Sequence, residues 1–494
     1  MTKAICICAA VILLAAATTG FAATDTRLAD AVRNHDNAAA RALLKQRVPV
    51  DSTDAEGATA LQWAVYNDDL ETADLLIQAK SNVNAANRLG VTPISLAAMN
   101  GNPRMVDLLL KAGADANGTG SSGETVLMTA ARTGNVDTVK TLLAHGANPN
   151  AKETARSQTA LMWAAAEGHV AVVRALAAAG ADLRARSTGG LTALLFAVRE
   201  GNTNVVKTLL EVGADVNEVT AAPPTARRRP AGQADSGEPA GGTSALVLAV
   251  ANAHFELASF LLDAGANPNA AEQGWTALHQ LTWIRNPGTG DNKPAPEGSG
   301  AMGSLEVARR LIAHGANVNA RMTKKAEMGS TDLNNTGSTP FLLAARAADI
   351  EMMRLLIGAG ADSSIPNADD VTPLLAAAGV GTHSPGEDAG TESDAVTAMR
   401  IALDLGNDIN AVDKNGESAM HGAAYKQFPA VVKFLAEKGA KPDVWNQKNK
   451  LGWTPLMIAE GVQRGNNIRT SASTALAIRD ALKSETAPKT QSPN

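Results

Sequence analysis

The sequence predicts an all-α solenoid of about eleven helix–turn–helix units, and three observations carry this prediction. A phrase of the form Gly-x-Thr-(Pro or Ala)-Leu recurs with a base period of 33 residues, which is the signature of a repeat architecture. Each phrase opens two short stretches whose apolar residues have helical spacing. Aromatic residues make up only 3% of the 494 residues, so the interior must be packed from small aliphatic side chains.

A Thr or Ser anchors the start of each unit. The anchors are Thr59, Thr92, Thr125, Thr159, Thr192, Ser244, Thr276, Thr339, Thr372, Ser418 and Thr454. Most successive anchors lie 32 to 34 residues apart, and the longer gaps mark insertions. Each unit is therefore expected to add one layer of the same kind to the stack.

The order of residues within a unit explains each of its elements. In Thr339-Pro340 the Thr is placed to cap a helix whose first turn the Pro ring fits. A turn at Gly101 separates such a helix from a second one, whose Val-x-x-Leu-Leu spacing includes Leu109. Gly113 then ends the second helix, because glycine adopts the left-handed conformation without steric cost. An Asn follows where a short polar side chain braces a turn, as at Asn117, Asn150, Asn217, Asn269 and Asn319.

A unit of this length with these phrases resembles the ankyrin repeat. Thr276-Ala277-Leu278-His279 is close to the family's Thr-Pro-Leu-His phrase. Gly213 to Asn217 and Gly315 to Asn319 match the phrase that follows the family's second helix. The resemblance implies an ankyrin-repeat solenoid over residues 56–483, with β-hairpin fingers between units and a leading capping unit at 23–55.

Three residues depart from the family pattern. Lys80 occupies a helix-ending Gly position, where the left-handed conformation costs a residue with a side chain about 1 kcal/mol. Arg184 and Ser364 replace the turn Asn. We therefore expect these two turns to be braced differently from the others.

Residues 1–22 have the features of a secretory signal peptide. A lysine precedes an apolar run at 5–19, and Gly20-Phe21-Ala22 puts small residues at the positions that signal peptidase reads. Cleavage after Ala22 predicts export, to the periplasm or to the exterior, and a retained membrane anchor is the alternative. Both cysteines would be removed with this segment, which suits an oxidising compartment. No later stretch is apolar enough to span a membrane.

Four stretches interrupt the period, near residues 219–242, 285–303, 321–336 and 380–394. Their Gly, Pro, Ser and charged residues are typical of surface loops. Two interpretations remain open: drift at tolerant loops, since longer loops add little closure entropy, or neighbouring loops that together enlarge a recognition site. The polar residues 484–494 are expected to form a disordered tail.

The sequence offers no constellation for catalysis, a cofactor or a metal ion. Gly118 to Gly123 match G-x-G-x-x-G, but the βαβ unit that a dinucleotide site needs does not surround them. His279 and His421 occupy the repeat's own His position, where the ring usually hydrogen-bonds the local turn. The net charge of −5 provides no global attraction to nucleic acid, and Arg227 to Arg229 are one short cluster. We therefore expect no catalytic, cofactor-binding or metal-binding residues and no nucleic-acid partner.

One repeat position, seven residues after the anchor, carries an unusual set of side chains. By resemblance to the family, it ends the first helix of each unit and faces a concave groove. Tyr, Trp and Arg dominate interface hot spots, and both tyrosines of the chain stand at this position. The predicted partner-binding residues are Tyr66, Met99, Arg132, Arg199, Trp283, Arg346 and Tyr425, joined by Trp275 and Trp453 after finger glycines. Trp63 and Trp163 are expected in the core, and the competing interpretation is that the row only caps exposed helix ends.

These observations predict an exported, monomeric, non-enzymatic scaffold that binds another protein through its groove and finger loops. The alternative is an enzyme, or an accessory subunit, whose small-molecule or glycan pocket is built by the insertions. A pocket needs convergent polar or titratable groups, whereas the groove position offers spaced aromatic and arginine side chains.

Removal of residues 1–22 would make Ala23 the first residue of the exported chain. Intact-mass measurement of material from the export compartment should match residues 23–494, because signal peptidase cleaves this segment on translocation. Recovery of the full-length chain from the cytosol would contradict this prediction.

Overall fold

The computed structural model describes residues 25–222, 241–288, 298, 300–326, 331–383, 389–464, 467–468 and 470–486. The predicted signal peptide and Arg227 to Arg229 lie outside the described residues. The last helix continues to Thr486, so the first residues of the expected tail are helical, and the rest of that tail also lies outside.

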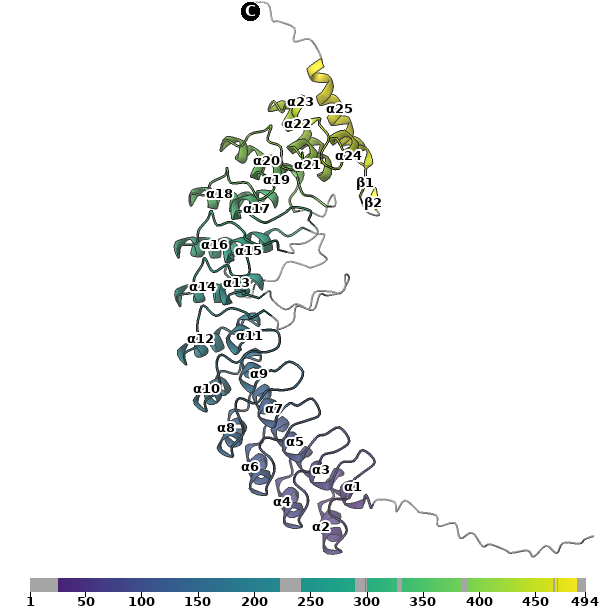
Figure 1. Ribbon diagram of the computed structural model, residues 1–494. Helices are drawn as coiled ribbons and strands as arrows, with labels where there is room; N and C mark the ends of the chain where they lie inside the picture. Colours follow the sequence, from purple (N-terminus) through teal and green to yellow (C-terminus); the bar gives the residue numbers. More distant parts are fainter. Residues whose placement is uncertain are drawn as a thin grey trace, which may run out of the picture. The chain divides into compact units, whose positions relative to one another are not determined.

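The described residues form helix pairs that follow one another along the chain (Figure 1). The leading pair is α1 (Arg27–Arg33) and α2 (Asn37–Lys45). Eleven pairs follow in the described part, each forming one repeat: α3 (Ala60–Tyr66) and α4 (Leu70–Gln78); α5 (Pro93–Asn100) and α6 (Pro103–Lys111); α7 (Val126–Thr133) and α8 (Val136–Ala144); α9 (Ala160–Ala166) and α10 (Val170–Ala178); α11 (Ala193–Arg199) and α12 (Thr203–Glu211); α13 (Ala245–Ala251) and α14 (Phe255–Asp263); α15 (Ala277–Arg285) and α16 (Ser304–Ala313); α17 (Pro340–Arg346) and α18 (Ile350–Gly358); α19 (Pro373–Ala378) and α20 (Glu392–Asp404); α21 (Ala419–Lys426) and α22 (Pro429–Glu437); α24 (Pro455–Gly461) and α25 (Ala472–Thr486). This arrangement confirms the predicted all-α repeat architecture.

The chain divides into two compact blocks. The first block ends at Thr133 and takes in residues 140–147, while residues 134–139 and 148–486 belong to the second. Within a block, the first helix of each pair, here called the inner helix, packs against those of its neighbours, as α3 does between α1 and α5. Buried residues are spread along both blocks rather than gathered in one core. In the part of the chain that is described, no helix combines the length and the apolar character needed to cross a bilayer.

The anchors cap the inner helices as predicted. Thr339 Oγ1 accepts a hydrogen bond from the backbone N–H of Leu342 at 3.2 Å, and Pro340 occupies the first turn. Thr59 and Gln62 cap each other's backbone N–H groups in a reciprocal capping box. Each inner helix therefore begins at a fixed residue, which keeps successive repeats in register.

The turn Asn residues do more than brace their own turns. Asn84 Nδ2 donates to the carbonyl of Gly113 at 3.0 Å, and its Oδ1 accepts from the N–H of Asp115 at 2.9 Å. Both partners belong to the next repeat, so the carboxamide bridges two repeats. We call this pair of hydrogen bonds the Asn bridge. The same bridge is made by Asn150, Asn217, Asn269 and Asn319.

The three departures from the pattern have visible consequences. Lys80 adopts a left-handed conformation with φ of 69°. The backbone N–H groups of Arg184 and Ser364 still donate to Asp182 and Asp362 in their own turns, at 2.9 and 2.8 Å, as the N–H of Asn217 does to Asp215. Neither side chain carries a carboxamide, so the two-bond Asn bridge cannot form at these positions.

The fingers are turns rather than the expected β-hairpins. In the described residues their backbones pair only through isolated bridges, such as Thr53 with Thr59 and Val412 with Ser418. In several fingers a side chain closes the turn instead, because Asp54, Asn87, Asn367 and Asp413 accept hydrogen bonds from their own finger's N–H groups. Too few residues then remain for a strand ladder. The described strand pair, β1 (Gln463–Arg464) with β2 (Asn467–Ile468), lies between the helices of the last repeat.

Stability should be distributed along the stack, since the contacts are between neighbouring repeats. Leu209 on α12 is fully buried, and Leu209→Ala should destabilise its repeat by about 2–5 kcal/mol. Hydrogen exchange should show protection lost first in the α11–α12 repeat and its neighbours. Equal loss of protection in every repeat would indicate a single cooperative core instead.

Candidate functional site

The first block exposes three of the predicted partner-binding side chains. Tyr66, Met99 and Arg132 lie at the ends of inner helices α3, α5 and α7, with exposed fractions of 57%, 50% and 46%. Arg132 Nη2 lies 3.6 Å from Glu124 Oε1, a loose ion pair. Arg33 holds the same position in α1 and is also exposed. The row in this block therefore presents an aromatic ring and a thioether between two guanidinium groups.

A pocket of about 510 Å³ lies beside Tyr66. The Trp63 indole meets the Tyr66 ring edge to face, with centroids 5.5 Å apart, and Leu89 on the next finger is 75% exposed. With Leu96, these side chains leave a solvent-exposed apolar patch, here called the Trp63–Leu89 patch. We include in it Met99, which is 50% exposed and lies three residues after Leu96 on the same helix, α5. The pocket is lined by Ala55, Glu56, Ala58, Gln62, Trp63, Tyr66, Asn87, Arg88, Leu89 and Leu96.

The prediction that Trp63 and Trp163 lie in the core is wrong, because both are half-buried. For Trp63 the reason is its indole N–H, which donates to Asp54 Oδ2 on the finger at 2.9 Å. This bond holds the ring against the finger at the groove rather than between repeats. The guanidinium of Arg33 covers the ring at 4.9 Å, a cation–π contact.

Both walls of the pocket are held by side-chain hydrogen bonds. Burial alone would raise the pKa of Asp54, but the hydrogen bonds from Ala58, Trp63 and Glu56 outweigh it and lower that pKa. On the opposite wall, Asn87 Oδ1 accepts from the N–H of Leu89 at 2.9 Å. The exposed Leu89 therefore stands on a closed turn, and the patch is preorganised for binding.

In the second block, two of the predicted residues hold an insertion in place. The indoles of Trp275 and Trp283 meet edge to face at 5.9 Å. Both pack against a buried cluster of Met322, Ala326 and Leu343, of which the first two belong to the 321–336 insertion. The two tryptophans are half-buried, so part of each ring is committed to this local core.

The other second-block residues are partly occupied as well. Arg199 pairs with Glu200 at 2.8 Å and covers the Phe196 ring at 4.9 Å. Arg346 and Trp453 are half-buried. Arg199 and Arg346 lie at the same repeat position as Tyr66, and Trp453 lies on a finger. Arg346 and Trp453 are less exposed than Tyr66 and Met99.

Tyr425 does not present an exposed ring, contrary to expectation, because it is only 6% exposed. Its hydroxyl donates to Glu417 Oε1 at 2.8 Å and accepts from Asn449 Nδ2 at 3.0 Å. Glu417 and Asn449 stand on the fingers before and after α21. Tyr425 therefore joins two fingers, and this network turns the ring inward.

Two of the insertions meet in space. Asp332 N and Thr331 Oγ1 donate to the carbonyl of Gly381 at 2.9 and 3.0 Å, which joins the 321–336 insertion to the 380–394 insertion. Beside this contact lies a polar pocket of about 300 Å³. Burial raises the pKa of Asp413 in its wall, and the nearby Asp369 acts in the same direction. The pocket is lined by Asp332, Leu333, Asn334, Asp369, Val371, Val380, Gly381, Asp413, Asn415, Glu417, Tyr425, Asn449, Lys450 and Leu451.

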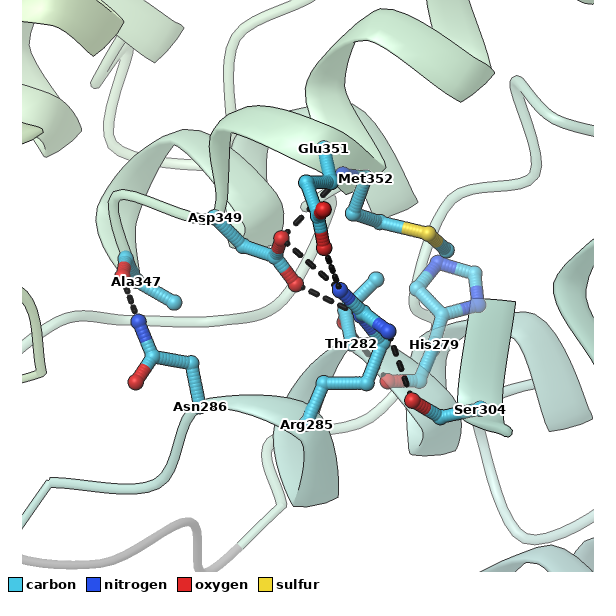
Figure 2. Close-up of polar contacts among 9 residues, drawn as sticks. All are labelled: His279, Thr282, Arg285, Asn286, Ser304, Ala347, Asp349, Glu351 and Met352. Carbon is cyan, nitrogen blue, oxygen red and sulfur yellow. Dashed lines mark hydrogen bonds and ion pairs between the residues drawn. The ribbon is translucent and has the colours of Figure 1, made fainter. Parts of the chain in front are cut away.

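A buried ion pair closes the base of the 285–303 insertion (Figure 2). Arg285 Nε and Nη2 bind the two carboxylate oxygens of Asp349 at 2.7 and 3.1 Å, and both side chains are at most 10% exposed. Arg285 Nη1 also donates to Ser304 Oγ at 2.6 Å, at the start of α16. One guanidinium therefore ties α15, α16 and α18 together where the insertion leaves the stack.

The repeat histidines have structural positions. Burial lowers the pKa of His279 and of His421 to about 4, so both rings are neutral near pH 7. His279 Nε2 lies 3.2 Å from the carbonyl of Ser338 in the next repeat. Among the described residues, no group of three or more His, Cys, Asp and Glu side chains is placed to hold a metal ion. Gly118 to Gly123 form a finger turn, in which Gly120 N donates to the carbonyl of Glu124.

A stack of helix pairs with exposed apolar side chains on its inner helices and fingers is the architecture of a repeat scaffold for protein–protein interaction. Three family descriptions match the sequence. "Ankyrin repeats (3 copies)" matches residues 79–153, 152–220 and 390–468. "Ankyrin repeats (many copies)" matches residues 28–77, and "Ankyrin repeat" matches 241–272, 273–323 and 336–371. The chain belongs to the ankyrin-repeat family, whose members are generally non-enzymatic interaction modules.

Curated relatives share part of this array. Ankyrin repeat protein B18 of vaccinia virus (strain Ankara) is 32% identical over 130 residues, which cover 24% of this chain and 19% of that protein. Neurogenic locus notch homolog protein 1 of Xenopus tropicalis is 32% identical over 147 residues, covering 26% of this chain and 6% of that protein. The chain therefore spans less than a fifth of the length of either relative.

Loss of Arg285 should destabilise the second block strongly. Arg285→Ala leaves the Asp349 carboxylate buried without its cation, which should cost about 3–5 kcal/mol in urea unfolding. Arg309→Ala is the matched control, because its ion pair with Glu306 is 57% and 49% exposed. The control should cost less than about 1 kcal/mol. Equal losses in the two variants would show that burial of the Arg285 pair is unimportant.

Proposed function

We propose that this chain is an exported, non-enzymatic scaffold that binds another protein through inner-helix ends and fingers. The Trp63–Leu89 patch is the observation that carries the proposal. Tyr66, Leu89 and Met99 leave at least half of their side chains exposed there, and contiguous exposed apolar surface marks interaction sites. The family supports an interaction role, and the signal-like residues 1–22 support export.

The patch has the composition of a binding hot spot. Trp63 and Tyr66 supply flat apolar area with few rotamers to lose on binding. Met99 adapts to irregular partner surfaces, and Leu89 projects from a rigid turn. Arg132 remains close to half exposed, so its guanidinium is placed to form charge-assisted bonds with partner carboxylates at the rim.

A second candidate function rests on the polar pocket beside Asp332. The described parts of two insertions and of three fingers converge there, as the hypothesis of an insertion-built small-molecule or glycan site requires. Carboxylates, carboxamides and a tyrosine ring line it, which suits a polar ligand with cationic or hydroxyl groups. The protein-binding proposal stands first because the Trp63–Leu89 patch is larger, more apolar and more exposed.

Substitutions in the patch should weaken partner binding without unfolding the chain. Tyr66→Ala and Met99→Ala should each cost about 1–3 kcal/mol in binding to a partner captured with the exported chain. Both side chains are at least half exposed, so melting temperatures should hardly change. Binding can be measured by calorimetry with the purified partner.

The control for this experiment lies on a second helix. Arg309→Ala removes an exposed side chain from α16 and should change affinity by less than about 0.5 kcal/mol. If Arg309→Ala weakens binding more than either patch variant, the partner uses the outer surface and the proposal is wrong.

A further inference from the structure

The turn that follows Arg184 offers two backbone groups that the missing Asn bridge leaves without a partner. In a bridged turn, the carboxamide donates to the carbonyl of the glycine that ends the second helix of the next repeat, and it accepts from the backbone N–H two residues later. After Arg184 the equivalent groups are the carbonyl of Gly213 and the N–H of Asp215. Among the described residues, neither of these groups takes part in a hydrogen bond.

The turn that carries these two groups has the geometry of a bridged turn. Gly213 adopts a left-handed φ of 104°, compared with 82° to 94° at the five glycines that receive a bridge. The N–H of Asn217 donates to Asp215 Oδ1 at 2.9 Å, as the N–H of Asn117 does to Asp115 in a bridged turn. The carbonyl and the N–H are therefore placed to receive a carboxamide, although the chain supplies none there.

A pocket of about 360 Å³ lies at these two groups. Its lining includes both of them, together with Leu183 and Arg184 of the preceding turn and Glu218. One wall is held by Arg186, whose Nη1 donates to the carbonyl of Val219 at 2.7 Å and whose Nη2 lies 3.6 Å from Glu218 Oε1. All of these residues belong to the second block, and their contacts form the pocket before any ligand binds.

The two backbone groups select a ligand that both donates and accepts a hydrogen bond. A carboxylate would accept from the N–H of Asp215 but would oppose the carbonyl of Gly213 and the carboxylate of Asp215. An ammonium or guanidinium group would donate to Gly213 but has no acceptor for the N–H of Asp215. A primary carboxamide does both, with the spacing that the asparagine side chain provides in the bridged turns.

We propose that this pocket binds the carboxamide of an asparagine side chain on a partner protein, which completes the missing Asn bridge from outside the chain. The carboxamide donates to the carbonyl of Gly213 and accepts from the N–H of Asp215. It fills only a fraction of the 360 Å³, so the residues that flank the asparagine fit there as well. The site is independent of the Trp63–Leu89 patch, and either can fail without the other.

A titration of the ¹⁵N-labelled exported chain with the peptide acetyl-Gly-Asn-Gly-N-methylamide, followed by NMR at the Asp215 N–H, tests this proposal. We expect a saturable shift with a dissociation constant of about 1–10 mM, because two neutral hydrogen bonds anchor the ligand. Peptides with alanine or aspartate in place of the asparagine should bind at least about fivefold more weakly. Propionamide, a free primary amide, should bind at least about threefold more weakly, because it lacks the flanking residues.

Three substitutions separate occupation of the site from loss of the arginine. Arg184→Asn supplies the carboxamide from the chain itself, so it should weaken peptide binding at least about tenfold and slow hydrogen exchange of the Asp215 N–H. Arg184→Ala leaves both backbone groups open and should bind the peptide within about threefold of the unaltered chain. Ser364→Asn is the matched control, because it adds an asparagine at the other turn without an Asn bridge, and it should bind normally.

Absence of a shift at the Asp215 N–H up to about 50 mM peptide overturns the proposal. So does equal binding of the alanine peptide, unchanged binding in Arg184→Asn, or an equal loss in Ser364→Asn. Loss of binding in Arg184→Ala would show that the guanidinium, and not the backbone pair, holds the ligand. Unchanged exchange of the Asp215 N–H in Arg184→Asn would show that the pair is not placed for a carboxamide, and equal binding of propionamide would contradict a partner's side chain.

Discussion

No helix pair in this protein can bury its apolar side alone, and the rest of the structure depends on that constraint. The inner helices approach closely because residues such as Ala97, Ala164 and Ala344 are small and fully buried. Capping residues set where inner helices begin, and the Asn bridge joins five of the turns to the next repeat. Each repeat is thus stabilised by its immediate neighbours, and each surface is formed by two or three adjacent repeats.

The insertions show which contacts a segment needs when it lies outside the stack of repeats. A loop outside the stack is not covered by a neighbouring repeat. Its stabilising contacts must therefore come from its own side chains or from side chains of the repeats beside it. The 321–336 insertion packs against Trp275 and Trp283, so less of each ring is exposed for binding a partner. The base of the 285–303 insertion relies on the buried Arg285–Asp349 pair, at a place where most other repeats have only a short turn between their helices. Recognition surface and structural support therefore compete for the same few aromatic and arginine side chains.

The features that recur in every repeat could be predicted from the sequence, whereas contacts that occur in a single repeat could not. Period, caps and turn positions follow from local rules that act within a dozen residues, so they could be read directly. Burial of Tyr425 could not, because it depends on Glu417 and on Asn449, which meet only after two fingers have packed. The same holds for Trp63, whose orientation follows from Asp54. It also holds for Leu89, whose one signal in the sequence is an apolar residue at a finger position that is shared by Leu451 and is polar in most other fingers. The family resemblance implied β-hairpin fingers. It gave no information on which side chains accept hydrogen bonds from the finger backbone, and these bonds are what shape the turns.

Because the Asn bridge is missing at Arg184 and at Ser364, two junctions between repeats of the second block are held by fewer hydrogen bonds than the bridged junctions. The junction between the α9–α10 and α11–α12 repeats lacks the Asn bridge. At the junction between the α17–α18 and α19–α20 repeats, a single hydrogen bond from Asn407 Nδ2 to the carbonyl of Ser363, at 3.0 Å, stands in its place. Such junctions are the places where thermal fluctuation or a pulling force separates a solenoid first. If both junctions open, the repeats from α11 to α18 separate from their neighbours together, while the contacts among these repeats are kept. This segment, from α11 to α18, contains three of the insertions, those near residues 219–242, 285–303 and 321–336. The hydrogen bond from Asp332 N to the carbonyl of Gly381 still joins the third of them to the α19–α20 repeat.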